Sequence, residues 1–240
     1  MTDSRSQLIE LNAVEFSWKP GIPVLDIPEL TISRGEKVFV CGPSGSGKTT
    51  LLGLLGGVIT PERGQVKILG NDISRISPVQ RDRFRADHIG FIFQMFNLIP
   101  YLSVIENVTL PLSFAKERKN HLTSIASSEQ NEARRLLKHL ELDDALLHRP
   151  VTELSIGQQQ RVAAARALIG KPDLIIADEP TSALDADTRE AFIKLLFAEC
   201  EAASDTLLFV SHDRSLEPLF DRTIALNEIN RASKAAPVKQ

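Results

Sequence analysis

The chain has 240 residues, of which 42% are apolar and 25% charged, as is usual for a folded soluble protein with one large domain or a core plus a subdomain. The 28 basic and 31 acidic side chains give a formal net charge of −3, so charge does not suggest nonspecific nucleic-acid binding. The first residues lack the apolar segment of a secretory signal, and no apolar run approaches the ~18 residues of a membrane span. Cys41 and Cys200 lie far apart without metal-ligand spacing, which favours a reduced, cytoplasmic setting.

Strands and helices alternate in the outer parts of the chain, which predicts a parallel α/β sheet. The predicted strands are 14–18, 24–32, 37–42, 65–70, 88–94, 173–180, 206–213 and 222–229. The predicted helices are 49–59 and 189–203, and the pattern from about 105 to 168 is mostly helical. The polar stretch 116–132 predicts a mobile loop or helix end, and 231–240 a disordered tail.

Residues 42–49, GPSGSGKT, match the pattern G-x-x-x-x-G-K-[ST] between a predicted strand and a predicted helix. Glycines let backbone N–H groups curve around phosphate oxygens, and the helix N-terminus adds partial positive charge. Lys48 is expected to reach the β- and γ-phosphates, and Thr49 to ligate Mg²⁺. The alternative is a chance glycine-rich turn. The expected ATP-binding residues here are Gly42, Pro43, Ser44, Gly45, Ser46, Gly47, Lys48, Thr49 and Thr50.

Two acids end the apolar strand in LIIADE, residues 174–179. A buried acid is costly unless it is paired, so two in succession indicate a function. We expect Asp178 to hold the hydration shell of Mg²⁺ and Glu179 to polarise the attacking water. The alternative is an acidic strand end that only caps a helix after Pro180.

Six segments in order resemble the ATP-binding cassette ATPases of ABC transporters. They are GPSGSGKT, FIFQ with Gln94, LSIGQ at 154–158, LIIADE, SALD at 182–185 and FVSHD with His212. The resemblance covers roughly residues 8 to 230. It implies an α/β fold: a RecA-like P-loop NTPase core with a parallel sheet, an N-terminal antiparallel β part and an inserted α-helical subdomain. The core would comprise 1–93 and 168–240, and the helical subdomain 94–167.

The resemblance also implies roles for single side chains. Trp18 would stack on adenine, although an edge-strand or core aromatic is the alternative. Gln94 would sense Mg²⁺ and the water, so that the implied Mg²⁺ residues are Thr49, Gln94 and Asp178. His212 would contact the γ-phosphate, against the alternative of an ordinary strand-end histidine. The other four histidines are expected at the surface: His88, His121, His139 and His148.

Ser155 is the predicted N-cap of a helix from 156 to 169, with Gly170 and Pro172 as stop signals. A helix N-terminus with a serine hydroxyl and a glycine N–H is an anion site. In the family, this segment binds the γ-phosphate held by the opposite subunit. The resemblance therefore implies a head-to-tail homodimer around two ATP molecules, with Asp185 at the same seam. The signature residues would be Ser155, Ile156, Gly157 and Gln158, and Ile156 departs from the commonest glycine, which leaves the hydrolysis rate open.

Residues 93–112 resemble the LolD/MacB/FtsE group, whose ATPases drive FtsX-like permeases. This implies a peripheral location at the cytoplasmic face of the bacterial inner membrane, an integral membrane permease, in some cases a periplasmic adaptor, and no nucleic acid. Two functions stay open: export or extrusion of lipoprotein, peptide or drug, and force transmission in the cell envelope without solute transport. DNA-repair ABC ATPases need a long coiled coil before the signature, translation-type proteins carry two cassettes, and P-loop kinases lack LSIGQ.

The stretch 95–99, MFNLI, is too apolar for an ordinary surface loop. We expect part of it to line a groove for a short cytoplasmic helix of the permease, with Phe96 as the residue to test. The alternative is that these side chains pack inside the helical subdomain.

Overall fold

The computed structural model describes residues 6–124, 128–182 and 184–232. Its contacts divide the chain into two compact units. Unit 1 comprises Met1–Asp82 with Leu208–Gln240, and unit 2 comprises Arg83–Leu207. One helix, α2 (Pro78–His88), and one strand, β8 (Thr206–Val210), each contain a boundary between the units. Each unit is described by itself below.

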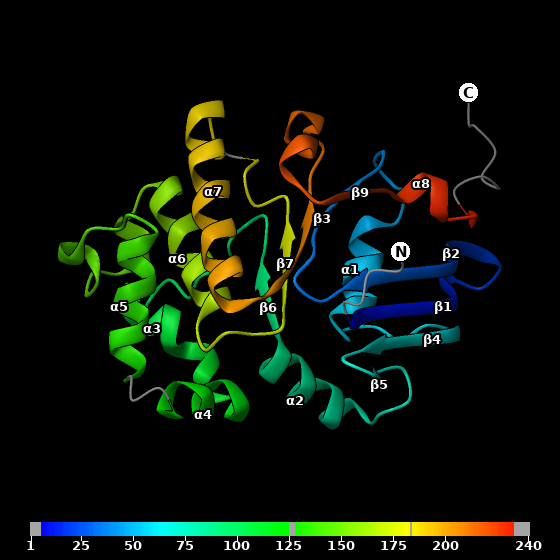
Figure 1. Cartoon of the computed structure of the whole chain (residues 1–240), viewed down its shortest axis with the longest axis horizontal. Helices are drawn as coiled ribbons and strands as arrows, with labels where there is room; N and C mark the ends of the chain where they lie inside the picture. The colour runs from blue at the N-terminus through cyan, green and yellow to red at the C-terminus, as the bar shows by residue number, and fades with distance from the viewer. Residues whose placement is uncertain (1–5, 125–127, 183, 233–240) are drawn as a thin grey trace. The chain divides into compact units, whose positions relative to one another are not determined.

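Unit 1 consists mainly of β structure (Figure 1). In chain order its elements are β1 Gln7–Lys19, β2 Ile22–Ser33, β3 Lys37–Cys41, α1 Lys48–Leu55, β4 Arg63–Ile68, β5 Asn71–Asp72, a 3-10 helix Arg214–Leu219, β9 Arg222–Ala225 and α8 Leu226–Ile229.

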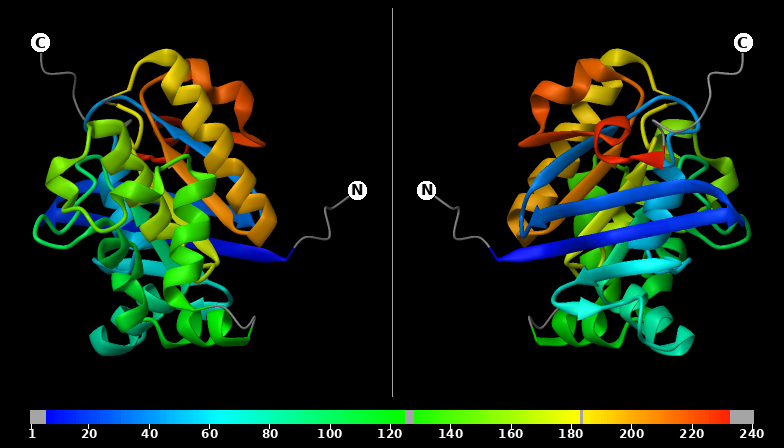
Figure 2. Two further views of the ribbon diagram at one scale, coloured as in Figure 1. Left: turned by 90° about the vertical axis from the view of Figure 1, so that its left-hand side faces the viewer. Right: turned by 90° about the vertical axis from the view of Figure 1, so that its right-hand side faces the viewer.

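Four strands of unit 1 form the predicted antiparallel part, in the order β2-β1-β4-β5 (Figure 2, dark blue to cyan). Leu11 of β1 pairs with Leu30 of β2 and Val66 of β4, and all three are buried. Because β2 is an edge strand, it tolerates prolines that would interrupt a central strand. The β1–β4 register shifts between Asn12 and Glu15, where a Cβ on Gly64 would lie 2.2 Å from the Ala13 carbonyl oxygen. Only glycine fits this close approach.

The strand that precedes the glycine-rich loop, β3, pairs in parallel with β9 in unit 1. Its Val38, Phe39 and Val40 are buried, as its continuous apolar sequence predicts for a parallel strand. The end of β8 also reaches β3, since the Ser211 N–H donates to the Val40 carbonyl at 3.3 Å.

Unit 2 is mostly helical and contains two paired strands (Figure 1). Its elements are β6 Ile89–Ile92, α3 Val104–Thr109, α4 Lys116–Ser124, α5 Glu129–His139, α6 Ile156–Leu168, β7 Leu174–Asp178 and α7 Ala186–Ala203, with 3-10 helices Leu110–Ser113, Asp144–Leu146 and Val151–Glu153. The pairing of β6 with β7 is parallel, with Ile92 opposite Ala177. The parallel and antiparallel strand pairs agree with the α/β class predicted from the sequence.

Three predicted elements differ from the structure. The helix predicted for 49–59 ends at Leu55, because Gly57 adopts a left-handed φ of 63°. The strand predicted for 222–229 ends at Ala225 and is followed by the short helix α8. The polar stretch 116–132 is helical on both sides of 125–127, which lie outside the described residues. Of the predicted tail, 233–240 also lie outside them.

The helix α2 was not predicted either. The sequence of α2 is mostly polar, and α2 has no buried residue, so it lacks the apolar stripe that marks a helix. Its N-terminus has a reciprocal cap instead: the Gln80 N–H donates to Ser77 Oγ at 3.3 Å, and the Ser77 N–H donates to Gln80 Oε1 at 3.0 Å. This S-x-x-Q pattern is a helix-start signal that the sequence did contain.

Candidate functional site

The glycine-rich loop of residues 42–47 connects β3 to α1 in unit 1. Gly45 and Gly47 have φ values of 78° and 97°, in the region that favours glycine. A Cβ on Gly47 would also lie 2.7 Å from Leu25 Cδ2 and 3.2 Å from the Val24 carbonyl oxygen. Position 47 therefore requires glycine for both its backbone angle and its space.

Three features of this loop fit an anion. The ammonium group of Lys48 donates to the carbonyls of Gly42 at 2.7 Å and Pro43 at 3.1 Å, so the loop curls around its own lysine. Ser46 Oγ is buried and has no hydrogen-bond partner among the described residues. No side chain caps the N-terminus of α1, whose first N–H groups are the usual ligands of phosphate. The loop therefore offers backbone, hydroxyl and ammonium donors to a nucleotide phosphate.

Asn230 anchors this loop from the far end of the chain, and the sequence gave no indication of it. Its side-chain amide donates to the Ser46 carbonyl at 3.1 Å and the Val24 carbonyl at 2.8 Å. Its Oδ1 accepts from the Asp26 N–H at 2.9 Å. Asn230 is completely buried, so these bonds join the loop to β2 in a place that water does not reach.

Trp18 lies near the end of β1 with 63% of its surface exposed. Its indole N–H donates to Thr50 Oγ1, 3.2 Å away on α1, and its ring meets Phe16 edge to face at a centroid distance of 4.9 Å. Trp18 is thus an exposed aromatic attached to the helix that follows the phosphate loop. This is a suitable place for a ring that stacks on a base, and the stacking role stays a prediction.

His212 and the phosphate loop line one cavity of about 390 Å³ in unit 1. Gly42 and Pro43 line it from the loop, and Ser211 and His212 from the segment after β8. The other lining residues are Cys41, Arg214 and Asn227. Residues separated by about 170 positions in the sequence therefore meet beside the loop. His212 is exposed, which gives its imidazole access to a ligand in that cavity.

In unit 2, Gln94 and the two acids gather at one edge of a strand pair. The strands β6 and β7 are parallel, with Ile92 opposite Ala177. Gln94 therefore follows the carboxyl end of β6, and Asp178 is the last residue of the adjacent β7. Ligands of open α/β sheets bind at such ends. Glu179 adopts a left-handed φ of 48°, a strained conformation for a side chain other than glycine and common at functional sites.

The predicted signature segment forms the N-terminus of α6. The Gln158 N–H donates to Ser155 Oγ at 3.3 Å, and the Ser155 N–H donates to Gln158 Oε1 at 2.9 Å, which makes a capping box. Ser155 is exposed, and Ile156 has 56% of its surface exposed, which is unusual for a large apolar side chain. In unit 2 this helix start is therefore accessible to a partner.

Two further contacts join α6 to its surroundings in unit 2. The buried Gln160 donates to the Pro180 carbonyl at 2.7 Å, directly after Glu179. A Cβ on Gly157 would lie 3.9 Å from Leu184 of SALD. Asp185, expected at the dimer seam, caps α7 by accepting the Thr188 N–H at 2.9 Å. Ala183 of SALD lies outside the described residues.

The apolar stretch after Gln94 divides into buried and exposed residues, so the expectation for Phe96 was wrong. Phe96 is only 9% exposed, while Met95 is 81% exposed. Phe96 and Asn97 both have left-handed φ values, and Arg166 of α6 donates to the carbonyl of each. This turn directs Phe96 inwards and Met95 outwards. Met95 is therefore the residue of this stretch that remains a candidate for contact with a permease.

One of the four histidines expected at the surface is half-buried. His88 Nδ1 lies 2.9 Å from Asp173 Oδ2, and its Nε2 lies 3.6 Å from Glu117 Oε2. Burial lowers its pKa, but the hydrogen bond and charge of Asp173, together with nearby acids, outweigh burial and raise the pKa overall. His121, His139 and His148 are exposed, and His139 is paired with Glu199.

Within the described ranges there is no cluster of three or more His, Cys, Asp or Glu side chains that could hold a metal ion by itself. The metal set expected from the sequence has a different chemistry: a threonine hydroxyl, a glutamine amide and one carboxylate. Such oxygen donors fit Mg²⁺, which keeps several waters and is usually shared with substrate phosphates. None of the described helices is long and apolar enough to cross a membrane.

The phosphate loop between a parallel strand and a helix defines a P-loop nucleotide-binding protein of the α/β class. The chain belongs to the ABC transporter family, whose sequence profile matches residues 25–182. It is 42% identical over 216 residues to the lipoprotein-releasing system ATP-binding protein LolD of Psychrobacter arcticus, covering 90% of this chain and 92% of that protein. It is 38% identical to the macrolide export ATP-binding/permease protein MacB of Syntrophobacter fumaroxidans, covering 97% of this chain but 34% of that protein.

Among solved structures, the fold is similar to a dimeric post-hydrolysis state of the ATP-binding cassette MJ0796 bound to ADP and Pi. The TM-score is 0.80 at 36% identity, and the match covers 94% of this chain and 95% of that one. The chain is therefore an ABC-type ATPase that binds and hydrolyses ATP.

Proposed function

We propose that this ATPase dimerises head to tail around two ATP molecules and powers an integral membrane permease of the FtsX, MacB or LolC type. The observation that carries the proposal is the exposed capping-box start of α6. This chain has one phosphate loop and one separate helix N-terminus suited to an anion. Two such half-sites on one chain are complementary in a two-fold dimer, since each chain can present its signature to its partner's nucleotide.

Each chain would contribute a set of groups to one nucleotide. The loop of residues 42–49 would hold the phosphates through backbone N–H groups and Lys48, and Trp18 would stack on adenine. Mg²⁺, held by Thr49, Gln94 and Asp178, would neutralise charge on the phosphate oxygens. Glu179 would accept a hydrogen bond from the attacking water at a carboxylate oxygen, and His212 would donate to the γ-phosphate. The partner's signature residues and Asp185 would close the site.

The proposed class of permease rests on the relatives rather than on the site. LolD is named for lipoprotein release and MacB for macrolide export. By this analogy, the chain lies at the cytoplasmic face of the inner membrane and drives export or extrusion, in some cases with a periplasmic adaptor. The exposed Met95 and its apolar neighbours are the proposed contact for the permease.

The substitution Glu179→Gln tests the dimer. This variant should bind ATP normally, lose most of its turnover, and accumulate as an ATP-bound dimer in size-exclusion chromatography. The matched control is Glu153→Gln, because Glu153 is an exposed acid of the same unit. Wild-type turnover in Glu179→Gln would disprove the catalytic role.

Cysteines placed at Ser44 and Ser155 test the arrangement of the two chains. In the presence of ATP they should crosslink one chain to the other, and the two native cysteines are buried and should not interfere. Crosslinking confined to single chains would disprove the head-to-tail arrangement.

A further inference from the structure

Unit 2 contains a cavity of about 260 Å³ beyond the C-terminal end of α6. Leu136 of α5, Leu168 of α6 and Ala203 of α7 form part of its apolar lining, and Asp205 and Lys171 contribute polar groups. A cavity of about 150 Å³ can hold benzene, so this one has room for about ten non-hydrogen atoms. None of its lining residues belongs to the expected ATP site.

Asp205 is the unusual residue of this cavity. It is 4% exposed, and its Oδ2 has no hydrogen-bond partner among the described residues. Its own backbone N–H is satisfied by the Cys200 carbonyl at 2.9 Å. Buried carboxyl groups are normally paired or hydrogen-bonded, because losing hydration without compensation costs free energy. Asp205 Oδ2 therefore lacks the hydrogen-bond or ion-pair partner that a buried carboxyl group normally has.

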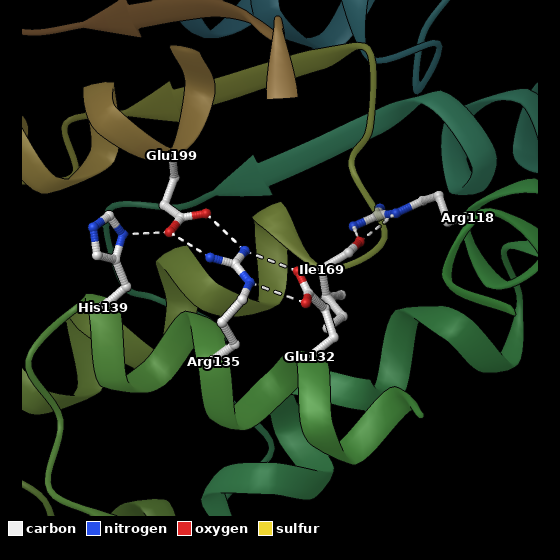
Figure 3. Close-up of polar contacts among 6 residues, drawn as sticks. All are labelled: Arg118, Glu132, Arg135, His139, Ile169 and Glu199. Carbon is white, nitrogen blue, oxygen red and sulfur yellow. Dashed lines mark hydrogen bonds and ion pairs between the residues drawn. The ribbon is translucent and has the colours of Figure 1, made fainter. Parts of the chain in front are cut away.

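Two arginines of unit 2 that lie near this cavity donate their hydrogen bonds to other groups. Arg118 donates from Nε to the Ile169 carbonyl at 2.8 Å (Figure 3). Its Nη2 donates to the Ala167 carbonyl at 2.8 Å, so this guanidinium satisfies carbonyls at the C-terminal end of α6. Arg135 lies between Glu132 and Glu199 and donates two hydrogen bonds to each, at 2.8 to 3.0 Å (Figure 3). Neither guanidinium is hydrogen-bonded to Asp205.

These surroundings keep Asp205 protonated near neutral pH. Burial, followed by the negative charge of Asp173, raises the pKa of Asp205 to about 8. The charges of Arg118 and Lys171 act in the opposite direction, and Glu199 adds to the rise. From α5, the cavity is also lined by Glu132 and Arg135.

We propose that this cavity binds a small primary amine with an apolar body, and that its ammonium group pairs with Asp205. The ammonium would supply the direct hydrogen-bonded partner that Asp205 Oδ2 lacks, since Arg118 and Lys171 act on Asp205 only through their charge. The leucine and alanine side chains would contact the apolar body. Three acids and two bases line the cavity, and two of the acids are ion-paired with Arg135, so Asp205 is the lining acid without an ion-pair partner among the described residues. The acids are Glu132, Glu199 and Asp205, and the bases are Arg135 and Lys171.

Binding would change the ionisation of Asp205. The amine enters as its ammonium ion, the Asp205 carboxyl group loses its proton to the buffer, and an ammonium–carboxylate pair remains. Since Asp205 is mostly protonated at pH 7, nearly one proton should be released for each amine bound. This proton release distinguishes pairing with Asp205 from apolar binding in the same cavity.

Isothermal titration calorimetry of the full chain with 2-phenylethylammonium tests the proposal. At pH 7, in two buffers of different ionisation enthalpy, we expect saturable binding with release of nearly one proton. The neutral analogue 2-phenylethanol should bind at least tenfold more weakly and release none. Asp205→Asn keeps the shape of the protonated carboxyl and should remove the preference for the amine, while Asp144→Asn, at an exposed site of the same unit, should retain it.

Equal affinity for amine and alcohol, or an unchanged amine affinity in Asp205→Asn, would overturn the proposal, as would the absence of saturable binding. A second measurement needs only the wild-type chain. Its affinity for the amine should rise about tenfold per pH unit from pH 6 to 7.5 and level off above the pKa of Asp205, while the ligand stays charged. An affinity independent of pH in this range would also overturn it.

Discussion

Asn230 donates a hydrogen bond to the backbone carbonyl of Ser46 across a separation of 184 positions in the chain. The same side chain holds β2 at the Val24 carbonyl and the Asp26 N–H. The shape of the phosphate loop therefore depends on a segment close to the C-terminus as well as on its own glycines.

We expect Asn230→Ala to weaken nucleotide binding and to lower the melting temperature. The substitution leaves two carbonyls, of Val24 and Ser46, and two backbone N–H groups, of Asp26 and Ala232, without this partner. The cost is about 1–3 kcal/mol for each group that stays unsatisfied. Nucleotide affinity should be measured well below the melting temperature, so that the folded chain is compared. The control is Asn71→Ala, because Asn71 is an exposed residue of the short strand β5 in the same unit. An unchanged affinity in Asn230→Ala would show that the loop keeps its shape without this tether.

Trp18→Ala should weaken ATP binding by about 1–3 kcal/mol, the usual contribution of base–aromatic stacking. Trp18→Phe should retain most of the affinity, since it keeps a ring and loses only the hydrogen bond to Thr50. Trp18 is the only tryptophan of the chain, so quenching of wild-type fluorescence reports the same contact directly. Tyr101→Ala, at an exposed aromatic in unit 2, should leave affinity unchanged. Full affinity in Trp18→Ala would exclude stacking.

Met95→Asp should reduce co-purification with the permease and preserve nucleotide binding, because Met95 is 81% exposed. Phe96→Asp should instead destabilise the chain, since it places a carboxylate in a buried position. Measuring the melting temperature, nucleotide affinity and permease association of both variants separates docking from packing. Normal permease association in Met95→Asp would remove this residue from the proposed contact.

Asp205→Asn should become progressively more stable relative to the wild type as the pH rises. The folded state raises the pKa of Asp205 from 3.8 to about 8, so folding favours the protonated form. The wild type therefore loses stability between about pH 4 and pH 8, with a slope approaching ~1.4 kcal/mol per pH unit, and asparagine removes that loss. Urea denaturation at pH 5, 7 and 9 should show the difference widening to pH 8 and then remaining constant. A difference independent of pH would contradict the raised pKa.

The sequence predicted what depends on neighbouring residues. The strand–loop–helix order around Lys48 and the serine cap of α6 are local patterns, and both are present. Contacts between distant positions were not predictable in this way. In the sequence, Asn230 looks like an ordinary polar residue, and Arg118 lies in a stretch whose polarity predicted a loop or helix end. In the structure both side chains are buried, and each donates hydrogen bonds to carbonyls of distant residues. The turn that buries Phe96 and exposes Met95 depends likewise on Arg166, about seventy positions away.

The hydrogen bond from Gln160 to the Pro180 carbonyl has a consequence for how two nucleotide sites would act together. Ser155 and Gln160 lie on the same rigid helix, little more than one turn apart, and Pro180 directly follows Glu179. In the proposed head-to-tail dimer, the nucleotide that binds one chain's Ser155 would belong to the partner, whereas Glu179 would act on the chain's own nucleotide. Occupancy of one site would then bias the carboxylate of the other through a few covalent and hydrogen bonds. Two nucleotide sites coupled in this way should hydrolyse ATP cooperatively, with a Hill coefficient above one. A substitution of Gln160 that removes its hydrogen bond to the Pro180 carbonyl should lower this coefficient towards one.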